Sequence, residues 1–215
     1  MTPLLKPVPG LEFYPEVHGY RLDGEWLPWS VTQVLSYDMP AYKKEIIEAT
    51  KDGPNGWLAR GTKIHKCLEH KLLTGEQRAD KKWAAWLEPL YDCDLFKGAE
   101  TLAAEYVMCD KIKRVGGTAD FILRIPSQNG SADRVVLGDL KTVKRTDRVH
   151  GRELPIAQLQ AYRSFLAVHA PFLNVTDVVT VVCGPDLTEV RPQDPDGWVE
   201  WSEAFGKFQA SQPNF

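Results

Sequence analysis

The sequence predicts a single α/β domain over residues 1–215, with a central mixed β-sheet flanked by helices and a mainly helical N-terminal region. Two observations support this prediction. In the first hundred residues apolar side chains recur mostly at helical spacing, whereas from about residue 102 they follow a strand pattern. Three consecutive strands are then followed by helix, strand and helix, an order typical of a sheet covered by helices.

The N-terminal region begins with short aromatic-rich strands between Gly, Pro and Asp turns, in LEFYP, GYRLDG and EWLPW. Ser30 is a suitable N-cap for a helix in VTQVLSY, and Pro40 allows a second helix in AYKKEIIEATK. A longer helix is expected over residues 56–75, where Gly75 supplies the stop. Residues 78–94 continue the helical region with an apolar stripe of Trp83, Trp86, Leu87 and Leu90.

The second half predicts three strands in LAAEYVMCD, GGTADFILRI and RVVLGDLKTV, joined by turn-rich segments. A helix follows over residues 154–170, with Pro155 near its first turn. DVVTVVCG is a buried strand by composition, and DGWVEWSEAFGKFQA fits a final helix. These elements supply a sheet with a helix crossing between two of its strands.

Composition excludes several classes of protein. No apolar run approaches the roughly 20 residues that span a bilayer, and the N-terminus lacks the pattern of a signal or transit peptide, so a cytoplasmic protein without membrane contact is expected. The four cysteines, which are widely spaced without a C-x-x-C pair, predict free thiols. The net charge of −3 argues against nonspecific coating of nucleic acid but permits a local basic patch.

Three acidic residues fall in the three consecutive strands: Glu105, Asp120 and Asp139. Each has apolar or small neighbours, so each carboxylate is expected on a largely buried element, where an unpaired charge is costly. Asp139 and Lys141 share a face of their strand because side chains alternate, yet one lysine cannot neutralise three carboxylates. A divalent cation such as Mg²⁺ or Mn²⁺ can. Taken singly, each residue also fits a structural role at a strand edge, in a turn or in an ion pair.

The ordered combination resembles the PD-(D/E)XK nuclease superfamily, in its RecB-like branch, which includes phage exonucleases and the mitochondrial genome maintenance exonuclease. The matching segments are WSVTQVL, RGTKIH, AAEYV, GGTAD, GDLKT and QLQAY, in the family's order along most of the chain. The resemblance implies a restriction-endonuclease-like αβββαβ core. The family's usual proline is replaced by Ala119, which is common in this branch.

The resemblance also implies roles for the site residues. Asp120 and Asp139 are the expected principal ligands of a Mg²⁺ or Mn²⁺ ion, with the main-chain carbonyl of Leu140, while Lys141 orients the attacking water or contacts the phosphate. Glu105 and His65 are expected to support the metal. Gln158 and Tyr162, one helical turn apart, are expected to border the site, although Tyr162 also fits a simple core position.

A basic segment follows the D-x-K motif and contains Lys144, Arg145, Arg148 and Arg152. It is expected to contact the nucleic-acid backbone, although a solvated charge run is the common alternative. Arg60, Lys63 and Lys66 are candidates for the opposite wall. Some relatives carry an iron–sulfur cluster on an upstream cysteine and a C-terminal cysteine group, but Cys183 is the only cysteine in the last hundred residues, so no cluster is expected.

The expected activity is metal-dependent DNA exonuclease action in phage or bacterial DNA recombination, repair or degradation, in the host cytoplasm if the chain is phage-encoded. Its expected partners are DNA with free ends and a single-strand annealing or recombination protein. Two alternatives stay open: an endonuclease with the same centre, and an inactive nucleic-acid-binding or assembly module. The sequence leaves strand preference, polarity, oligomeric state and the choice between DNA and RNA open.

Overall fold

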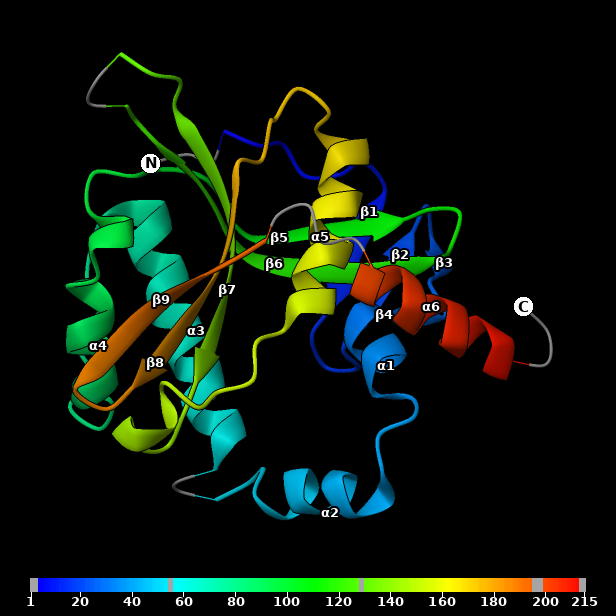
Figure 1. Ribbon diagram of the computed structural model, residues 1–215, viewed down its shortest axis with the longest axis horizontal. Coiled ribbons are helices and arrows are strands. Elements are labelled where there is room, and N and C mark those ends of the chain that lie inside the picture. Colours follow the sequence, from blue (N-terminus) through cyan, green and yellow to red (C-terminus); the bar gives the residue numbers. More distant parts are fainter. Residues whose placement is uncertain (1–3, 54–55, 128–129, 195–198, 213–215) are drawn as a thin grey trace.

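The protein is a mixed α/β structure in which helices cover both faces of a six-stranded sheet (Figure 1). The computed structural model describes residues 4–53, 56–127, 130–194 and 199–212. A small antiparallel sheet precedes the main one and consists of β1 (Leu11–Tyr14), β2 (Gly19–Leu22) and β3 (Glu25–Trp26). The predicted fold class is therefore confirmed.

The main sheet is organised around β6 (Val115–Ile125). β5 (Glu100–Asp110) pairs antiparallel with most of β6, and β7 (Arg134–Thr142) pairs antiparallel with its second half. β4 (Trp29–Ser30) lies parallel to the first residues of β6. β8 (Asp177–Gly184) runs parallel to β7, and β9 (Leu187–Gln193) closes this side as an antiparallel edge strand.

The helices lie in two layers, one on each side of the sheet (Figure 1). One layer contains α1 (Val31–Ser36), α5 (Ile156–His169) and α6 (Val199–Ser211), and α5 connects the parallel strands β7 and β8. The other contains α3 (Trp57–Thr74) and α4 (Ala84–Tyr91), followed by the short helix η1 (Asp94–Phe96). The order α3, β5, β6, β7, α5, β8 is the αβββαβ order that the sequence predicts.

The two layers enclose separate parts of the core. Leu159, Phe165 and Phe208 belong to the cluster beneath α1, α5 and α6, whereas Ile64, Leu68 and Leu90 belong to the cluster beneath α3 and α4. Side chains of β7 contribute alternately to the two clusters, with Leu137 in the first and Val136 in the second. This alternation places Asp139 and Lys141 on the α5 side of the sheet and Leu140 on the α3 side.

Several element boundaries differ from the prediction. EWLPW forms two strands of different sheets, with Leu27 and Pro28 between them, and Pro28 lacks the N–H that a continuous strand would use. α4 begins at Ala84, six residues later than expected, after a segment without regular structure and a turn. The predicted start of the last helix lies outside the described residues, and the described part begins at Val199.

Two further elements stand out. β9 is absent from the prediction, because its residues are half-buried almost throughout and show no alternation, and because it contains Pro192, which an edge strand tolerates. α2 (Ala41–Ala49) connects the two layers and buries none of its side chains. Among the described residues no helix has the length and apolar character that a membrane span requires.

Candidate metal centre

The centre lies where β6 and β7 separate. The last paired residues are Phe121 and Gly138, so Asp120 and Asp139 stand on the two diverging ends. The Leu140 N–H, which has no ladder partner on β6, donates a short hydrogen bond to Asp120 Oδ2. Because the N–H and C=O of one strand residue point to the same edge, the Leu140 carbonyl is directed toward β6 as well. The Leu140 side chain is 1% exposed and packs in the core beneath α3.

Glu105 lies opposite Asp120 on the neighbouring strand. Ala104 pairs with Phe121 and Tyr106 pairs with Ala119, which sets Glu105 across from Asp120 between them. Two carboxylates in directly opposed positions repel each other. Glu105 also has φ +47°, a left-handed conformation that is uncommon for a residue with a side chain and that occurs often at functional sites. The chain thus holds a second acid at this point against both electrostatic and backbone preference.

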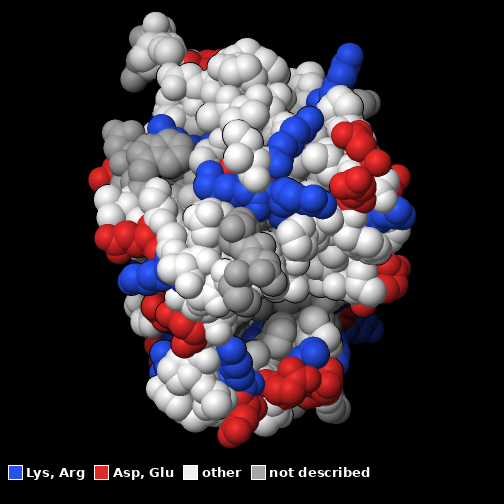
Figure 2. All heavy atoms as spheres, turned by 90° about the vertical axis from the view of Figure 1, so that its right-hand side faces the viewer, with Lys and Arg blue, Asp and Glu red and all other residues white. Residues whose placement is uncertain are grey.

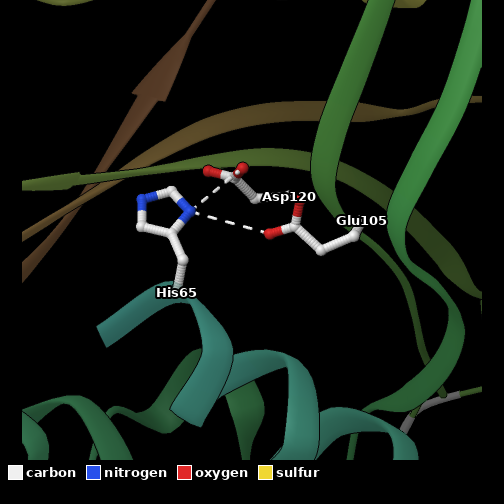
Figure 3. A group of neighbouring side chains, drawn as sticks. All are labelled: His65, Glu105 and Asp120. Carbon is white, nitrogen blue, oxygen red and sulfur yellow. Dashed lines mark ion pairs between the residues drawn. The ribbon is translucent and has the colours of Figure 1, made fainter. Parts of the chain in front are cut away.

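His65 projects from α3 toward both carboxylates (Figure 3). Its Nδ1 lies 3.3 Å from Asp120 Oδ1 and 3.7 Å from Glu105 Oε1. One ligand atom from each of the three residues lies within 4.8 Å of the other two, so the group could hold a metal ion. Ile64 and Leu68 on α3 are buried and pack the helix against the sheet. This packing positions His65 between α3 and the sheet.

The electrostatics of this group are dominated by shared charge. Burial lowers the pKa of His65, but Asp120 and Glu105 outweigh it and hold that pKa well above its usual value. Burial raises the pKa of Asp120, whereas His65, Lys141 and the Leu140 N–H together bring it below its usual value. The pKa of Glu105 is raised by burial and by Asp120, against the opposing effect of His65. Without a cation, His65 is therefore the principal partner of two acids.

Asp139 belongs to a second group, on the α5 side of the sheet. Lys141 Nζ lies 3.0 Å from Asp139 Oδ1 and 2.9 Å from Oδ2, and it donates to Gln158 Oε1 at 3.2 Å. Gln158 Nε2 donates to Asp139 Oδ1 at 2.9 Å and to the Tyr162 hydroxyl at 3.0 Å. The four side chains form one network from β7 to α5.

Asp139 remains under-satisfied within this network. Its side chain is 2% exposed, and Oδ2 accepts no hydrogen bond of acceptable geometry although Lys141 lies near it. Burial raises the pKa of Asp139 to about 6, with Lys141 lowering it and Asp120 raising it. Three carboxylates thus face one lysine and one imidazole. A divalent cation could be held by the group of His65, Glu105 and Asp120, whose carboxylate oxygens supply negative charge to it.

Two glycines explain why the GGTAD segment suits this centre. A Cβ on Gly116 would lie 2.3 Å from the Tyr20 ring, and a Cβ on Gly117 would lie 2.5 Å from the Tyr162 ring. Each tyrosine therefore packs directly on the backbone of β6 close to Asp120. The Tyr20 hydroxyl also makes a 3.0 Å hydrogen bond with Thr118 Oγ1. Only glycine permits this close approach.

The predicted basic residues have different surroundings. Four exposed basic residues follow β7, in the segment that contains the short helix η2 (Thr146–Arg148): Lys144, Arg145, Arg148 and Arg152. Arg145 forms an ion pair with Asp147. Lys63 forms an ion pair with Asp80 at 3.0 Å. Arg60 is buried, with 5% of its surface exposed, which the sequence does not predict.

Basic side chains also occur away from the centre. Figure 2 shows a row of Lys and Arg side chains on the face that includes the turn between β5 and β6. This turn contains Lys111, Lys113 and Arg114, of which Lys113 pairs with Asp110 and Arg114 with Glu25. Positive charge alone therefore does not identify a nucleic-acid path on this molecule.

The structure brings together most of the predicted site residues, in two adjoining groups. His65, Glu105 and Asp120 form the group on the α3 side, and Asp139, Lys141, Gln158 and Tyr162 form the one on the α5 side. Sequence reasoning missed Thr142, whose hydroxyl accepts a hydrogen bond from Arg60. The signal was available, since strand alternation places Thr142 on the same face as Leu140.

Comparisons with known proteins add little. No family model matches the chain, and no curated protein matches it. A solved structure described as the crystal structure of SSO0001 is similar at 15% sequence identity, with 86% of this chain and 85% of that chain covered and a TM-score of 0.35. A match with so low a TM-score carries no information on function.

Proposed function

We propose that the protein is a metal-dependent DNA exonuclease. The observation that supports this most is the joint position of three strand carboxylates, a histidine and a lysine at the point where β6 and β7 separate. Acidic ligands next to a lysine suit hydrolysis of a phosphodiester, in which a metal ion and a cation both meet phosphoryl oxygens. The sequence resemblance to RecB-like nucleases points to the same reaction.

The residues that would hold Mg²⁺ or Mn²⁺ are His65, Glu105, Asp120 and Asp139, with the Leu140 carbonyl. When bound, the ion supplies a more nucleophilic water and neutralises charge on the phosphate. His65 must be neutral to bind the ion, because an imidazole ligates a metal only without its second proton. The high pKa of His65 in the metal-free group implies that metal binding releases this proton.

Lys141 is the cation nearest to the expected phosphate. Its ammonium group, held by Asp139 and Gln158, is fixed at the end of β7 while its side chain remains 23% exposed. In this position it can orient the attacking water and balance the charge that grows on the phosphoryl oxygens. In the hydrolysis the water oxygen bonds to phosphorus, the bond from phosphorus to the 3′ oxygen breaks, and that oxygen leaves with a proton.

The strand being cut would approach along the exposed basic segment of residues 144–152, which leaves β7 directly after Lys141 and Thr142. Phosphate contacts of this kind position a nucleic acid without reading its sequence. An annealing or recombination protein is the proposed partner, since such proteins act on the single strands that an exonuclease exposes. The proposed place of action is the cytoplasm.

The test is digestion of end-labelled DNA, single-stranded and duplex, linear and circular, with Mg²⁺ or Mn²⁺. An exonuclease degrades the linear substrates from an end and leaves both circles intact, and excess chelator stops the reaction. Cleavage of circles would show an endonuclease instead. Binding of DNA without metal-dependent turnover would contradict nuclease activity altogether, and turnover in chelator would contradict the metal mechanism.

A further inference from the structure

Arg60 is a buried cation without a carboxylate partner. Only 5% of its surface is exposed, and the one hydrogen bond of its side chain within the described chain is from Nε to Thr142 Oγ1, at 3.4 Å. Its Nη atoms make no hydrogen bond within the described chain and are not fully enclosed. The guanidinium is thus almost wholly buried, and its Nη donors have no partner among the residues that the structure describes.

This arrangement is costly unless an anion completes it. Transfer of a charged group out of water is unfavourable without a compensating charge, and burial accordingly lowers the pKa of Arg60. Neighbouring cations are matched: Lys63 on the same helix pairs with Asp80, and Lys141 on β7 pairs with Asp139. Arg60 has no such acid among the residues that the structure describes, although it is the most buried of the three.

The position of Arg60 relates it to the metal centre. It precedes His65 by five residues on α3, a rise of about 7.5 Å along the helix axis and a rotation of about 140° around it, so the two side chains leave different faces of the helix. Its hydrogen-bond partner Thr142 follows Lys141 by one residue on β7. Gly61, next to Arg60, leaves open space here, because a Cβ at this position would meet only Thr142 Oγ1, at 3.9 Å. Three carboxylates of the centre share Lys141 and His65, whereas Arg60 has no acid partner among the described residues.

We propose that Arg60 and Thr142 form a binding subsite for a phosphate group of the substrate strand, next to the phosphate that is cut. This inference rests on the proposed nuclease function. The guanidinium presents parallel N–H donors that fit two phosphate oxygens at once, and the Thr142 hydroxyl fixes its orientation through Nε. A metal ion and a phosphodiester strand together supply both charges that the protein lacks at this place. The group bound is an internal phosphodiester or the phosphate at a strand end.

The first experiment compares Arg60→Met, Arg60→Lys and the wild type in DNA binding with Ca²⁺, which is expected to support binding with little cleavage. Methionine preserves the packed stem and removes the charge. We expect the Kd for a short single strand to rise about tenfold or more in Arg60→Met, as for the loss of a charged hydrogen bond, and less in Arg60→Lys. Arg134→Met is the matched control, since Arg134 pairs with Asp177 at the opposite end of β7. Affinity unchanged by Arg60→Met would overturn the proposal.

The second experiment locates the phosphate. Oligonucleotides with one neutral methylphosphonate at successive positions, with or without a terminal phosphate, are bound to the wild type and to both Arg60 variants. A methylphosphonate at one position should lower the affinity of the wild type for DNA without lowering that of Arg60→Met any further. If that position is internal, the subsite binds a phosphodiester; if the loss comes from removal of the terminal phosphate, it binds a strand end. If every methylphosphonate weakened binding to Arg60→Met as much as it weakens binding to the wild type, the proposal would be overturned. If Arg60→Met fails to fold, the same comparison is made with Arg60→Lys.

A third measurement separates this inference from the nuclease proposal. Inorganic phosphate should raise the Tm of the metal-free wild type but not that of Arg60→Met or Arg60→Lys to the same degree, because only the wild type has the full donor set. A wild type that shows this shift but cuts no DNA would refute the nuclease function and keep the anion subsite. A wild type that cuts DNA while all Arg60 variants bind DNA and phosphate equally well would refute the subsite alone.

Discussion

Asp120 and Asp139 lie on neighbouring strands and are both largely buried, with 12% and 2% of their side chains exposed, yet their pKa values are displaced in opposite directions. The pKa of Asp139 is raised to about 6, and that of Asp120 is lowered. Burial raises both values, so burial does not explain the difference. The surroundings do: Asp120 faces His65 and the Leu140 N–H, whereas Asp139 is more deeply buried and shares Lys141 with Gln158.

The two halves of the centre therefore differ in their readiness for a metal ion. On the α3 side an ionised Asp120 and Glu105 are held together by a protonated His65, which must lose its proton to become a ligand. On the α5 side burial raises the pKa of Asp139 to about 6, and Lys141 is its paired cation. A cation that bridged both halves would stabilise the ionised form of every acid in the centre.

The largest effect is expected from Asp120→Asn, which removes the acid that pairs with His65 and accepts the Leu140 N–H. Cleavage should fall by about a thousandfold or more, since the variant loses a principal ligand in a preorganised site. The pKa of His65 should fall toward its usual value, because its strongest partner is neutralised. Single-turnover cleavage and an NMR titration of His65 measure the two effects. Arg134→Met serves as the control, and an unchanged His65 titration would contradict the assigned pairing.

Lys141→Met should lower kcat about 100- to 1000-fold while metal affinity is retained, because the lysine stabilises charge near the phosphate and is not a ligand. The pKa of Asp139 should rise above its present value of about 6 once its cation is lost. Calorimetric metal titration together with kcat separates the two roles. Parallel losses of metal affinity and kcat would contradict this assignment of Lys141.

The pH dependence should report Asp139. At subsaturating Mg²⁺, kcat/KM should be about tenfold lower at pH 5 than on its plateau, because the centre needs the ionised form of a group with pKa about 6. In Asp139→Glu the ascending limb should move, since the longer side chain changes burial and contacts. A wild-type profile that stays flat from pH 8 to 5 would show that Asp139 does not limit the reaction.

The same pKa fixes the sign of a stability effect in the metal-free protein. The folded pKa of Asp139, about 6, lies above the unfolded value of about 4, so the folded state keeps a proton that the unfolded state loses. The contribution of Asp139 to the free energy of unfolding therefore declines as pH rises from about 4 to about 6. Asp139→Asn should remove this decline, and urea unfolding at several pH values measures it.

The smallest effect is expected from Tyr162→Phe. The variant keeps the ring that packs on Gly117 and loses only the hydroxyl that accepts a hydrogen bond from Gln158. The cost of such a bond is about 1 kcal/mol, so kcat should fall by no more than about fivefold and the Tm by about 2 to 4 °C. Gln158→Leu should cost more, because Asp139 and Lys141 both lose a partner. Equal effects of the two variants would contradict the proposed order of contacts.

The sequence by itself determined the order of the central elements from α3 to β8 and the acidic positions of the site. The three strands, the crossing helix and the next strand follow from local periodicity, which depends on neighbours within a few residues. The shared face of Asp139 and Lys141 follows in the same way, from the alternation of a strand. These features could be predicted because the information that fixes them is contiguous in the chain.

Only the tertiary structure decided how the acids are divided and what each one meets. The separation of β6 from β7, the left-handed conformation of Glu105 and the burial of Arg60 against Thr142 depend on contacts between residues far apart in the chain. Whether a buried charge is matched depends on the packing of α3 and α5 against opposite faces of the sheet. Local sequence cannot specify this, because the same aspartate is stabilised or penalised by whichever side chains the fold brings to it.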